Sequence, residues 1–430
     1  MAKENCPKAA KAEITLISIV TALCLVGDSF LYVALPLHWE SAGLATLFEV
    51  GVILAANRLV RIPLNPLITL FYNKVSCRTG IWIATILAII STAGYGLSQG
   101  LFLWLCMRFL WGLSWTLLRL GTLFTILRVS SPSTLGYLTG INNGLYRLGS
   151  LAGMLLGGLL ADSFGLQTTA LFFAAVSCLA PLVMLKMPKS EERTRGNASQ
   201  TSAVQAANRA GWKEILAKGP ALWVMMTAFV VAMTYQGVTA STISMLLDAH
   251  SHEKLVILGL TLSAATLSGG LQAMRWVWEP FLAPFFGSLS DGRMGRCRLS
   301  AIAFAISAVT LLPGAMDLGL VSLSLVILLV LLSGTLLTTA TDALGNDAAL
   351  LSENSRTYLS AFALFTDLGA AAGPLFAYTV IALAGTGLAW VLTSLFLAVF
   401  AVYWWVHPYP ASFRNFFSKA GVRQRERDAQ

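Results

Sequence analysis

GSLAGMLLGG, Gly149–Gly158, places four glycines inside one long apolar run. In water, each glycine would destabilise a helix by about 1 kcal/mol relative to alanine. In a bilayer the lipid tails are as apolar as leucine, so transmembrane helices associate through close backbone approach, which small residues at every fourth position allow. The stretch therefore predicts a membrane-spanning helix whose glycine face, formed by Gly149, Gly153, Gly157 and Gly158, packs closely against a neighbour.

The composition of the whole chain is that of a polytopic, all-α membrane protein. Of its 430 residues, 56% are hydrophobic and 11% are charged, and the mean hydropathy is +0.72; an ordinary soluble protein has about 25% charged residues. Apolar runs of about 20 residues predict twelve transmembrane helices. They cover residues 14–36, 44–72, 79–98, 101–127, 134–161, 166–187, 219–246, 255–288, 299–316, 318–342, 357–384 and 386–406.

The basic residues predict the orientation of these helices. With the N-terminus placed inside, 22 of the 29 Lys and Arg fall on cytoplasmic segments, six fall within helices, and Lys254 falls on an outer loop. This is the positive-inside pattern, with both termini cytoplasmic. The net charge of +9 therefore indicates topology and no nucleic-acid partner, and the expected location is a bacterial inner membrane.

A polar segment rich in Ser, Asn and Gln divides the chain into two halves. Because it cannot bury a core, residues 189–218 are predicted to be a cytoplasmic linker between an N-terminal six-helix bundle, 1–188, and a C-terminal one, 219–410. Residues 411–430 form a basic cytoplasmic tail. Short matches relate the halves: NRLVRIPLNP from Asn57 to MRWVWEPFLAP from Met274, and RLGSLAG from Arg147 to DLGAAAG from Asp367. Parallel six-helix repeats are typical of transporters that rock two bundles about a central cavity.

These features, together with three motifs, resemble the major facilitator superfamily over the whole chain. GSLSDGRMGRCR from Gly287 resembles its cytoplasmic signature, and the resemblance implies that Asp291 caps a neighbouring helix while Arg293 and Arg296 clamp the closed inner gate. RFLWG from Arg108 is similar to its fourth-helix arginine motif, which is associated with proton coupling. GSLAGMLLGG matches every glycine of its antiporter signature, although Met154 replaces the proline. The resemblance implies a secondary active transporter that works as a monomer.

Charged residues inside the predicted helices point to the substrate class. A charge at mid-bilayer costs from about 2.5 kcal/mol upward, so it usually faces a cavity or a partner. The deep cations are Arg58, Arg61, Arg108, Arg119, Arg147 and Arg275; the deep anions are Asp28, Glu279 and Asp367, with Glu49 and Asp342 nearer the helix ends. An anionic ligand would relieve the surplus of positive charge. We therefore expect proton-coupled export of a small anionic or zwitterionic solute, for which a siderophore-like polycarboxylate would be suitable.

The expected substrate cavity combines these charges with aromatic and amide side chains. Besides Asp28, Glu279, Asp367 and the six arginines, it is predicted to include Tyr32, Trp111, Trp115, Asn143, Tyr235 and Gln236. Asp28 and Asp367 are the expected proton carriers, with Arg108 in the coupling path. The family fold places helix 134–161 beside 255–288 and helix 44–72 beside 357–384. It therefore implies ion pairs between Arg147 and Glu279, and between Asp367 and either Arg58 or Arg61.

Three alternatives remain open at this point. A proton-coupled exporter of cationic or lipophilic drugs would anchor its substrate at Asp28 between aromatic walls. A divalent-metal transporter would need hard or imidazole ligands, yet all four histidines fall in loops or at a helix end. A receptor or lipid-handling protein of the same fold would bind ligand without moving it. The sequence contains no phosphate-binding loop, HExxH or nucleophile elbow, so neither an enzyme nor a bound cofactor or metal is expected.

Overall fold

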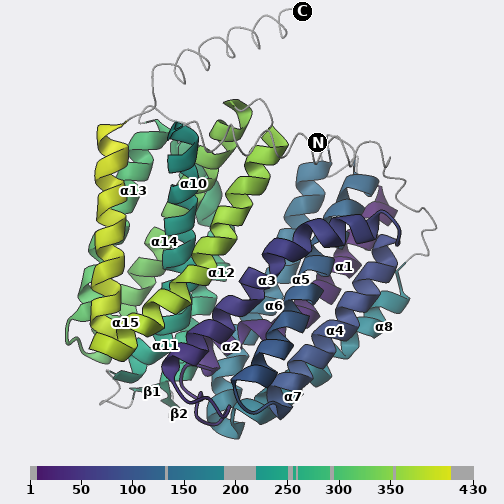
Figure 1. Ribbon diagram of the computed structural model, residues 1–430, viewed down its shortest axis with the longest axis horizontal. Coiled ribbons are helices and arrows are strands. Elements are labelled where there is room, and N and C mark those ends of the chain that lie inside the picture. The colour runs from purple at the N-terminus through teal and green to yellow at the C-terminus, as the bar shows by residue number, and fades with distance from the viewer. Residues whose placement is uncertain are drawn as a thin grey trace, which may run out of the picture.

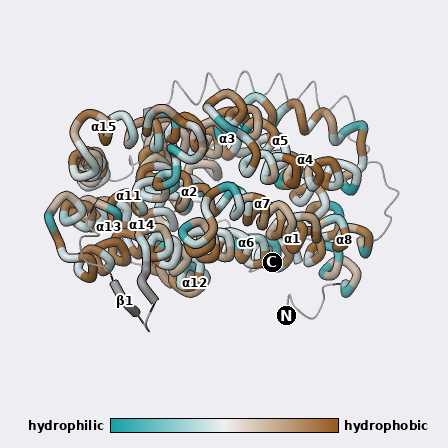
Figure 2. Tube along the Cα trace, turned by 90° about the horizontal axis from the view of Figure 1, so that it is seen from below, coloured by the Kyte–Doolittle hydropathy of each residue, from teal (hydrophilic) through white to brown (hydrophobic). Residues whose placement is uncertain are grey.

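The computed structural model describes residues 7–130, 134–187, 219–249, 255–257, 260–290, 295–351 and 355–407. Within these ranges the first half of the chain, 7–187, and the second half, 219–407, lie side by side in Figure 1. The start of α1 and the end of α15 lie at the same end of the molecule. Figure 2, seen from below, shows hydrophobic residues in brown along the helices, with paler and hydrophilic residues between them.

The first half contains eight helical segments among its described residues. They are α1 (Lys8–Ser29), α2 (Leu31–Ala34), α3 (Leu47–Tyr72), α4 (Cys77–Leu97), α5 (Leu101–Val129), α6 (Leu135–Phe164), α7 (Leu166–Ser177) and α8 (Leu179–Leu185). α1 and α2 are almost continuous, as are α7 and α8, so each pair covers one predicted helix. Predicted and observed ends in this half differ by at most six residues.

The second half begins with α10 (Gly219–Ala232), the π-helical segment η1 (Met233–Thr239) and α11 (Ala240–Ala249). Two short strands, β1 (Leu255–Ile257) and β2 (Leu260–Leu262), pair antiparallel before α12 (Ala264–Ser290). There follow α13 (Arg296–Leu311), the short 3₁₀ segment η2 (Leu312–Ala315), α14 (Leu320–Leu351) and α15 (Ser355–Val406). α15 is interrupted at Gly385, whose φ of 84° is non-helical.

Two predicted helix ends are wrong. The helix expected from residue 255 begins at Ala264, because residues 255–262 form the β1–β2 hairpin; a short apolar run does not by itself distinguish strand from helix. The helix expected to end at Asp342 continues to Leu351. Its polar residues around Asp342 mark a wall of a cavity and not the end of the helix.

The chain is an integral, multi-pass membrane protein. Nine helices of the described residues are long and apolar enough to cross a membrane. The other two long helices, α3 and α12, contain the intramembrane charges Arg58, Arg61, Arg275 and Glu279, which lower their hydropathy. Large apolar side chains such as Phe102, Phe281 and Leu383 are more than three-quarters exposed. A protein surface of this kind is suited to lipid.

The glycines of α6 provide the close helix contacts that the sequence predicts. A Cβ at Gly149 would overlap the carbonyl oxygen of Ala22 on α1, and one at Gly153 would lie 2.6 Å from that of Val26. Gly157 likewise abuts Phe30, and Gly158 abuts Ala265 of α12. The helix contacts expected between the halves are also confirmed, since α6 packs against α12 and α3 against α15.

The second half repeats this arrangement at related positions. Gly369 and Gly373 of α15, which belong to the DLGAAAG match, abut the backbone at Phe229 of α10 and at Gly237 of η1. The backbones of α15 and η1 therefore approach as closely as those of α6 and α1. This correspondence supports an internal repeat.

Candidate functional site

Two adjoining cavities occupy the space between the halves, and together we call them the central cavity. The α3 side, about 450 Å³, is lined by residues of α1, α3, α5, α6, η1 and α15. The α14 side, about 590 Å³, is lined mainly by residues of α10, α12, α14 and α15. Gln236, Phe362 and Thr366 border both sides. Gln236 stands on η1, and π-helical segments are frequent at functional sites.

Most of the predicted cavity residues line the central cavity. Asp28, Tyr32, Arg58, Arg61, Trp115, Arg119, Gln236 and Asp367 line its α3 side, and Arg147, Gln236, Arg275 and Glu279 line its α14 side. They come from both halves of the chain. A solute in this space would therefore contact the first half and the second half at once.

Asp28 forms a buried ion pair with Arg108 within the first half. Arg108 is fully buried, and its Nη1 lies 2.5 Å from Asp28 Oδ1, which also accepts a hydrogen bond from Asn57 Nδ2 at 3.3 Å. Arg108 Nε donates to the carbonyl oxygen of Ile53 at 3.0 Å. Asp28 faces the cavity from this network, whereas Arg108 lies behind it and lines neither side.

Asp367 is shared by two arginines of the first half in what we call the Asp367 cluster. Arg58 Nη1 lies 3.9 Å from Asp367 Oδ1, and Arg119 Nη1 lies 3.9 Å from Oδ2. Arg58 Nη1 also donates to Gln236 Oε1 at 3.1 Å. The ion pair expected between Arg58 and Asp367 is thus present.

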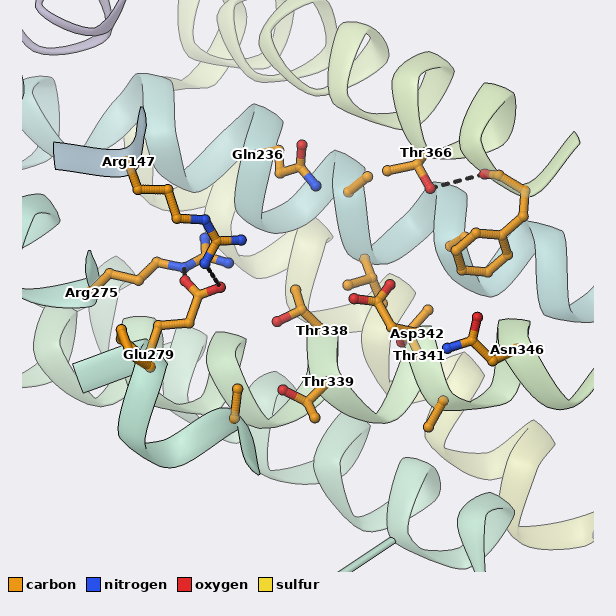
Figure 3. Close-up of a pocket in the computed structure, with 17 residues that line it drawn as sticks. Arg147, Gln236, Arg275, Glu279, Thr338, Thr339, Thr341, Asp342, Asn346 and Thr366 are labelled. Carbon is orange, nitrogen blue, oxygen red and sulfur yellow. Dashed lines mark hydrogen bonds and ion pairs between the residues drawn. The ribbon is translucent and has the colours of Figure 1, made fainter. Parts of the chain in front are cut away.

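Glu279 forms a tighter arrangement, the Glu279 cluster, at the junction of α6 and α12. Arg147 Nη1 donates to Glu279 Oε1 at 2.8 Å, and Arg275 Nε lies 3.4 Å from Oε2, as Figure 3 shows. Both guanidinium groups also lie over the Trp276 ring, 5.2 and 5.8 Å from its centroid. The expected pair between Arg147 and Glu279 is confirmed, and Arg275 joins it.

Four predicted cavity residues lie away from both sides of the central cavity. Trp111 is fully buried in a cluster with side chains of α1, α3 and α4, and the Tyr235 hydroxyl lies 3.0 Å from Ser333 Oγ. Asn143 is exposed on α6, and Arg108 lies behind Asp28. Helical spacing places Trp111 one turn from Trp115, but neighbouring helices enclose that turn of α5, which spacing alone does not reveal.

The polar face of α14 was not predicted from the sequence. Asp342, expected near a helix end, lines the α14 side together with Thr338, Thr339 and Asn346, and Figure 3 shows these side chains along one helix. Residues 338, 342 and 346 recur every four positions, which places them on one helical face. This four-residue spacing of polar residues could have predicted the cavity wall from the sequence.

The two halves are joined by hydrogen bonds where α6 ends and α12 begins. The Asp162 carboxylate at the end of α6 accepts hydrogen bonds from the Thr266 backbone N–H at 3.1 Å, from the Thr266 hydroxyl at 2.8 Å and from the Ser263 hydroxyl. It thus caps the start of α12, where a carboxylate is favourable. His38 Nε2 lies 3.7 Å from the same carboxylate. We call this group the Asp162 latch.

The structure describes only part of the GSLSDGRMGRCR motif, which was predicted to form the inner gate. Gly287 lies in α12, and Arg296 at the start of α13 pairs with Asp347 and donates to the carbonyl oxygen of Ala343 at 3.0 Å, both on α14. Asp291 and Arg293 lie outside the described residues. Within the described part of the chain, no group of three or more His, Cys, Asp or Glu side chains is arranged to hold a metal.

Comparison with known proteins identifies a family. Residues 17–279 match the model of the Major Facilitator Superfamily. The chain is 24% identical over 291 residues to the multi-drug resistance efflux pump PmrA homolog of Lactococcus lactis subsp. lactis (strain IL1403), covering 67% of this chain and 66% of that protein. It is 32% identical over 170 residues to the multidrug resistance protein MdtG of Rahnella sp. (strain Y9602), covering 39% and 37%. The chain thus spans just under two thirds of the first relative's length and just over a third of the second's.

Several solved structures share the fold. The nucleoside transporter NupG superposes with a TM-score of 0.73 at 13% identity, covering 93% of this chain and all of that one. A bacterial homolog of the human lysosomal transporter Spinster, in an inward-facing and unoccupied conformation, gives 0.72 at 15% identity, covering 96% and 98%. A POT family transporter in complex with 5-aminolevulinic acid gives 0.71 at 12% identity, covering 93% and 96%.

Proposed function

Because the chain belongs to the Major Facilitator Superfamily, we propose that it is a secondary active transporter that exports a small anionic or zwitterionic organic solute in exchange for protons. The family consists of transporters and not enzymes, in agreement with the absence of enzyme motifs from the sequence. The observation that carries the proposal is a cavity lined by charged residues of both halves, in which the buried Arg61 has no ion-pair partner among the described residues.

The proposed architecture is twelve transmembrane helices in two six-helix bundles, 1–188 and 219–410, with a linker between them and a basic tail. The spans are α1–α2, α3, α4, α5, α6, α7–α8, α10–η1–α11, α12, α13–η2, α14 and the two parts of α15 on either side of Gly385. Both termini are proposed to be cytoplasmic, since the basic residues favour that side.

With this orientation, we propose that the structure is an inward-facing state. The Asp162 latch lies at the outer end and joins α6 to α12. The central cavity is bordered by Arg119 and Asn346, which lie in the later parts of α5 and α14, toward the end that carries the termini. Solute would enter from that end, and Asp291, Arg293 and Arg296 would close it in the outward-facing state.

For coupling, we propose that Asp28 and Asp367 carry the transported proton. Both carboxylates line the cavity and pair with arginines. Protonation of either one would release its arginine, so the ion pairs at the interface would change partners between states. Arg108 would sense the charge of Asp28 from behind the cavity wall.

The first test is proton movement in proteoliposomes with an imposed pH gradient and an internal pH dye. Citrate, amino acids, tetraphenylphosphonium and Mn²⁺ would be added in turn. We expect proton flux with the carboxylate-bearing solutes, strong loss of this flux in Arg61→Gln and its abolition in Asp28→Asn. Asp317→Asn, an exposed carboxyl position outside both sides of the cavity, is the matched control. Flux with cations or metal alone would refute the anionic or zwitterionic substrate.

Efflux of cationic or lipophilic drugs is the second candidate. It is favoured by the printed names of the two relatives, both of which refer to multidrug resistance. Asp28, Tyr32 and Trp115 line the α3 side and offer a carboxylate with aromatic surfaces. The ion pair of Asp28 with Arg108 argues against it, because a drug cation would have to compete with a guanidinium at 2.5 Å. Flux with tetraphenylphosphonium that Asp28→Asn abolishes would favour this candidate.

A further inference from the structure

Two charged side chains of opposite sign in the central cavity have no ion-pair partner among the described residues. Arg61, on the α3 side, is only 8% exposed, and its Nε has no hydrogen-bond partner. Asp342 faces the α14 side, where the two neighbouring guanidinium groups, Arg147 and Arg275, both pair with Glu279. Because an unpaired charge away from water is costly, a ligand anion at the buried Arg61 would be stabilised. The Asp342 side chain is exposed to the cavity, where its carboxylate can attract a ligand cation.

The threonines around Asp342 present hydrogen-bond acceptors to the cavity. The hydroxyls of Thr338, Thr339 and Thr341 donate to backbone carbonyls one turn earlier on α14 at 2.7, 2.8 and 2.8 Å. Their protons are therefore already used, and lone pairs remain. An ammonium group has three donors and no acceptor. It is thus complementary to the Asp342 carboxylate and these hydroxyl oxygens, whereas a carboxylate would be repelled.

The surroundings of Arg61 favour the opposite charge. Its guanidinium carbon lies 5.4 Å from the centroid of the Trp115 ring, so the ring covers one side of the group. The neighbouring Arg58 is already engaged with Gln236 and Asp367. A guanidinium binds a carboxylate through two parallel N–H donors. Arg61 is therefore the position at which a solute carboxylate gains most.

We propose that the substrate is a zwitterion with separated charges, bound with its carboxylate at Arg61 and its primary ammonium group at Asp342. Gln236, Phe362 and Thr366, which border both sides of the cavity, would lie along its middle. Arg61 belongs to the first half and Asp342 to the second, so such a solute attracts the two halves to one another. A solute with one charge engages one half only. The inference rests on the transport function proposed above and specifies its substrate class.

Binding to the purified full-length protein tests the proposal. Isothermal titration calorimetry would compare 4-aminobutyrate, 6-aminohexanoate and 8-aminooctanoate with hexanoate and hexylamine, which carry one charge each. We expect at least one of the three zwitterions to bind at least tenfold more tightly than either singly charged compound. Arg61→Gln should weaken zwitterion and hexanoate binding tenfold or more and leave hexylamine unchanged. Asp342→Asn should weaken zwitterion and hexylamine binding and leave hexanoate unchanged.

Matched controls are Arg298→Gln and Asp317→Asn, since both side chains are exposed and line neither side of the cavity. The proposal is overturned if none of the three zwitterions binds more tightly than hexanoate and hexylamine, or if the two variants affect all compounds alike. Counterflow of the same compounds in proteoliposomes separates the two proposals. Transport of hexanoate without the zwitterions would leave the transporter standing and refute the zwitterion, whereas binding without any counterflow would refute the transporter.

Discussion

The Glu279 cluster and the Asp367 cluster each join the two halves through one carboxylate and two arginines, but they differ in tightness. Arg147 donates to Glu279 at 2.8 Å, whereas Arg58 and Arg119 both lie 3.9 Å from Asp367, beyond hydrogen-bond distance. Arg147 and Asp367 occupy matching positions in RLGSLAG and DLGAAAG, with opposite charge. The repeat thus places one hydrogen-bonded ion pair and one longer ion pair at the two junctions.

The helix packing beneath the two clusters is nearly identical, in contrast to their charges. Gly149 lies two residues after Arg147 and abuts Ala22, and Gly369 lies two residues after Asp367 and abuts Phe229. Close backbone contact therefore holds the helix that carries each cluster. The difference in tightness comes from the side chains and not from the helices that position them.

The largest effect is expected from filling these contacts. Gly149→Val and Gly369→Val each place a branched side chain against a backbone carbonyl that cannot move aside. Each should destabilise the protein by about 3 kcal/mol, at the upper end of overpacking costs, and abolish transport. The measurement is the thermal midpoint in detergent together with proteoliposome flux. Gly144→Val on the same helix is the control, because a Cβ there meets nothing within 4 Å. Equal loss in the control would contradict the packing argument.

Breaking the tighter cluster should have the next largest effect. Glu279→Gln leaves Arg147 and Arg275 facing each other without a carboxylate, and removal of one partner of a buried pair costs about 2–5 kcal/mol. Because the Arg147 side chain is 33% exposed, we expect about 2 kcal/mol, at the lower end of the range. The thermal midpoint at two ionic strengths would measure this loss of stability, and flux would be recorded under the same conditions. An unchanged midpoint would show that Glu279 does not tie α6 to α12.

The smallest effect on stability is expected at the looser cluster. Asp367→Asn should change the thermal midpoint little, because both of its ion pairs are long and Arg119 is half exposed. Flux should nevertheless fall about tenfold if partner exchange accompanies transport, which corresponds to about 1.4 kcal/mol. Asp367→Asn combined with Arg58→Gln should recover part of that flux. A double variant no better than the worse single variant would show that the two are not compensating partners.

Much of the fold could be read from the chain because lipid leaves a spanning segment few ways to satisfy its backbone. The glycine face of 149–158 and the contacts Arg147–Glu279 and Arg58–Asp367 follow from spacing and from the family resemblance. The sequence did not predict the hairpin at 255–262 or the continuation of α14 past Asp342. Short apolar and polar runs are compatible with several structures. Trp111 and Tyr235 were assigned to the cavity because spacing identifies a helical face and not which neighbour covers it.

The sequence by itself determined that this is a multi-pass membrane protein with an internal repeat, arginines and carboxylates within its helices, and membership of a transporter family. The membrane class and the intramembrane charges follow from composition and periodicity, whereas the repeat and the family follow from short matching motifs. Only the tertiary structure decided which charges meet. In the folded chain Asp28 pairs with Arg108 and Asp342 lines the cavity. Arg61 has no ion-pair partner among the described residues. The physical reason is that the energy of a charge in a membrane protein depends on its few nearest neighbours, and those come from helices far apart in the sequence.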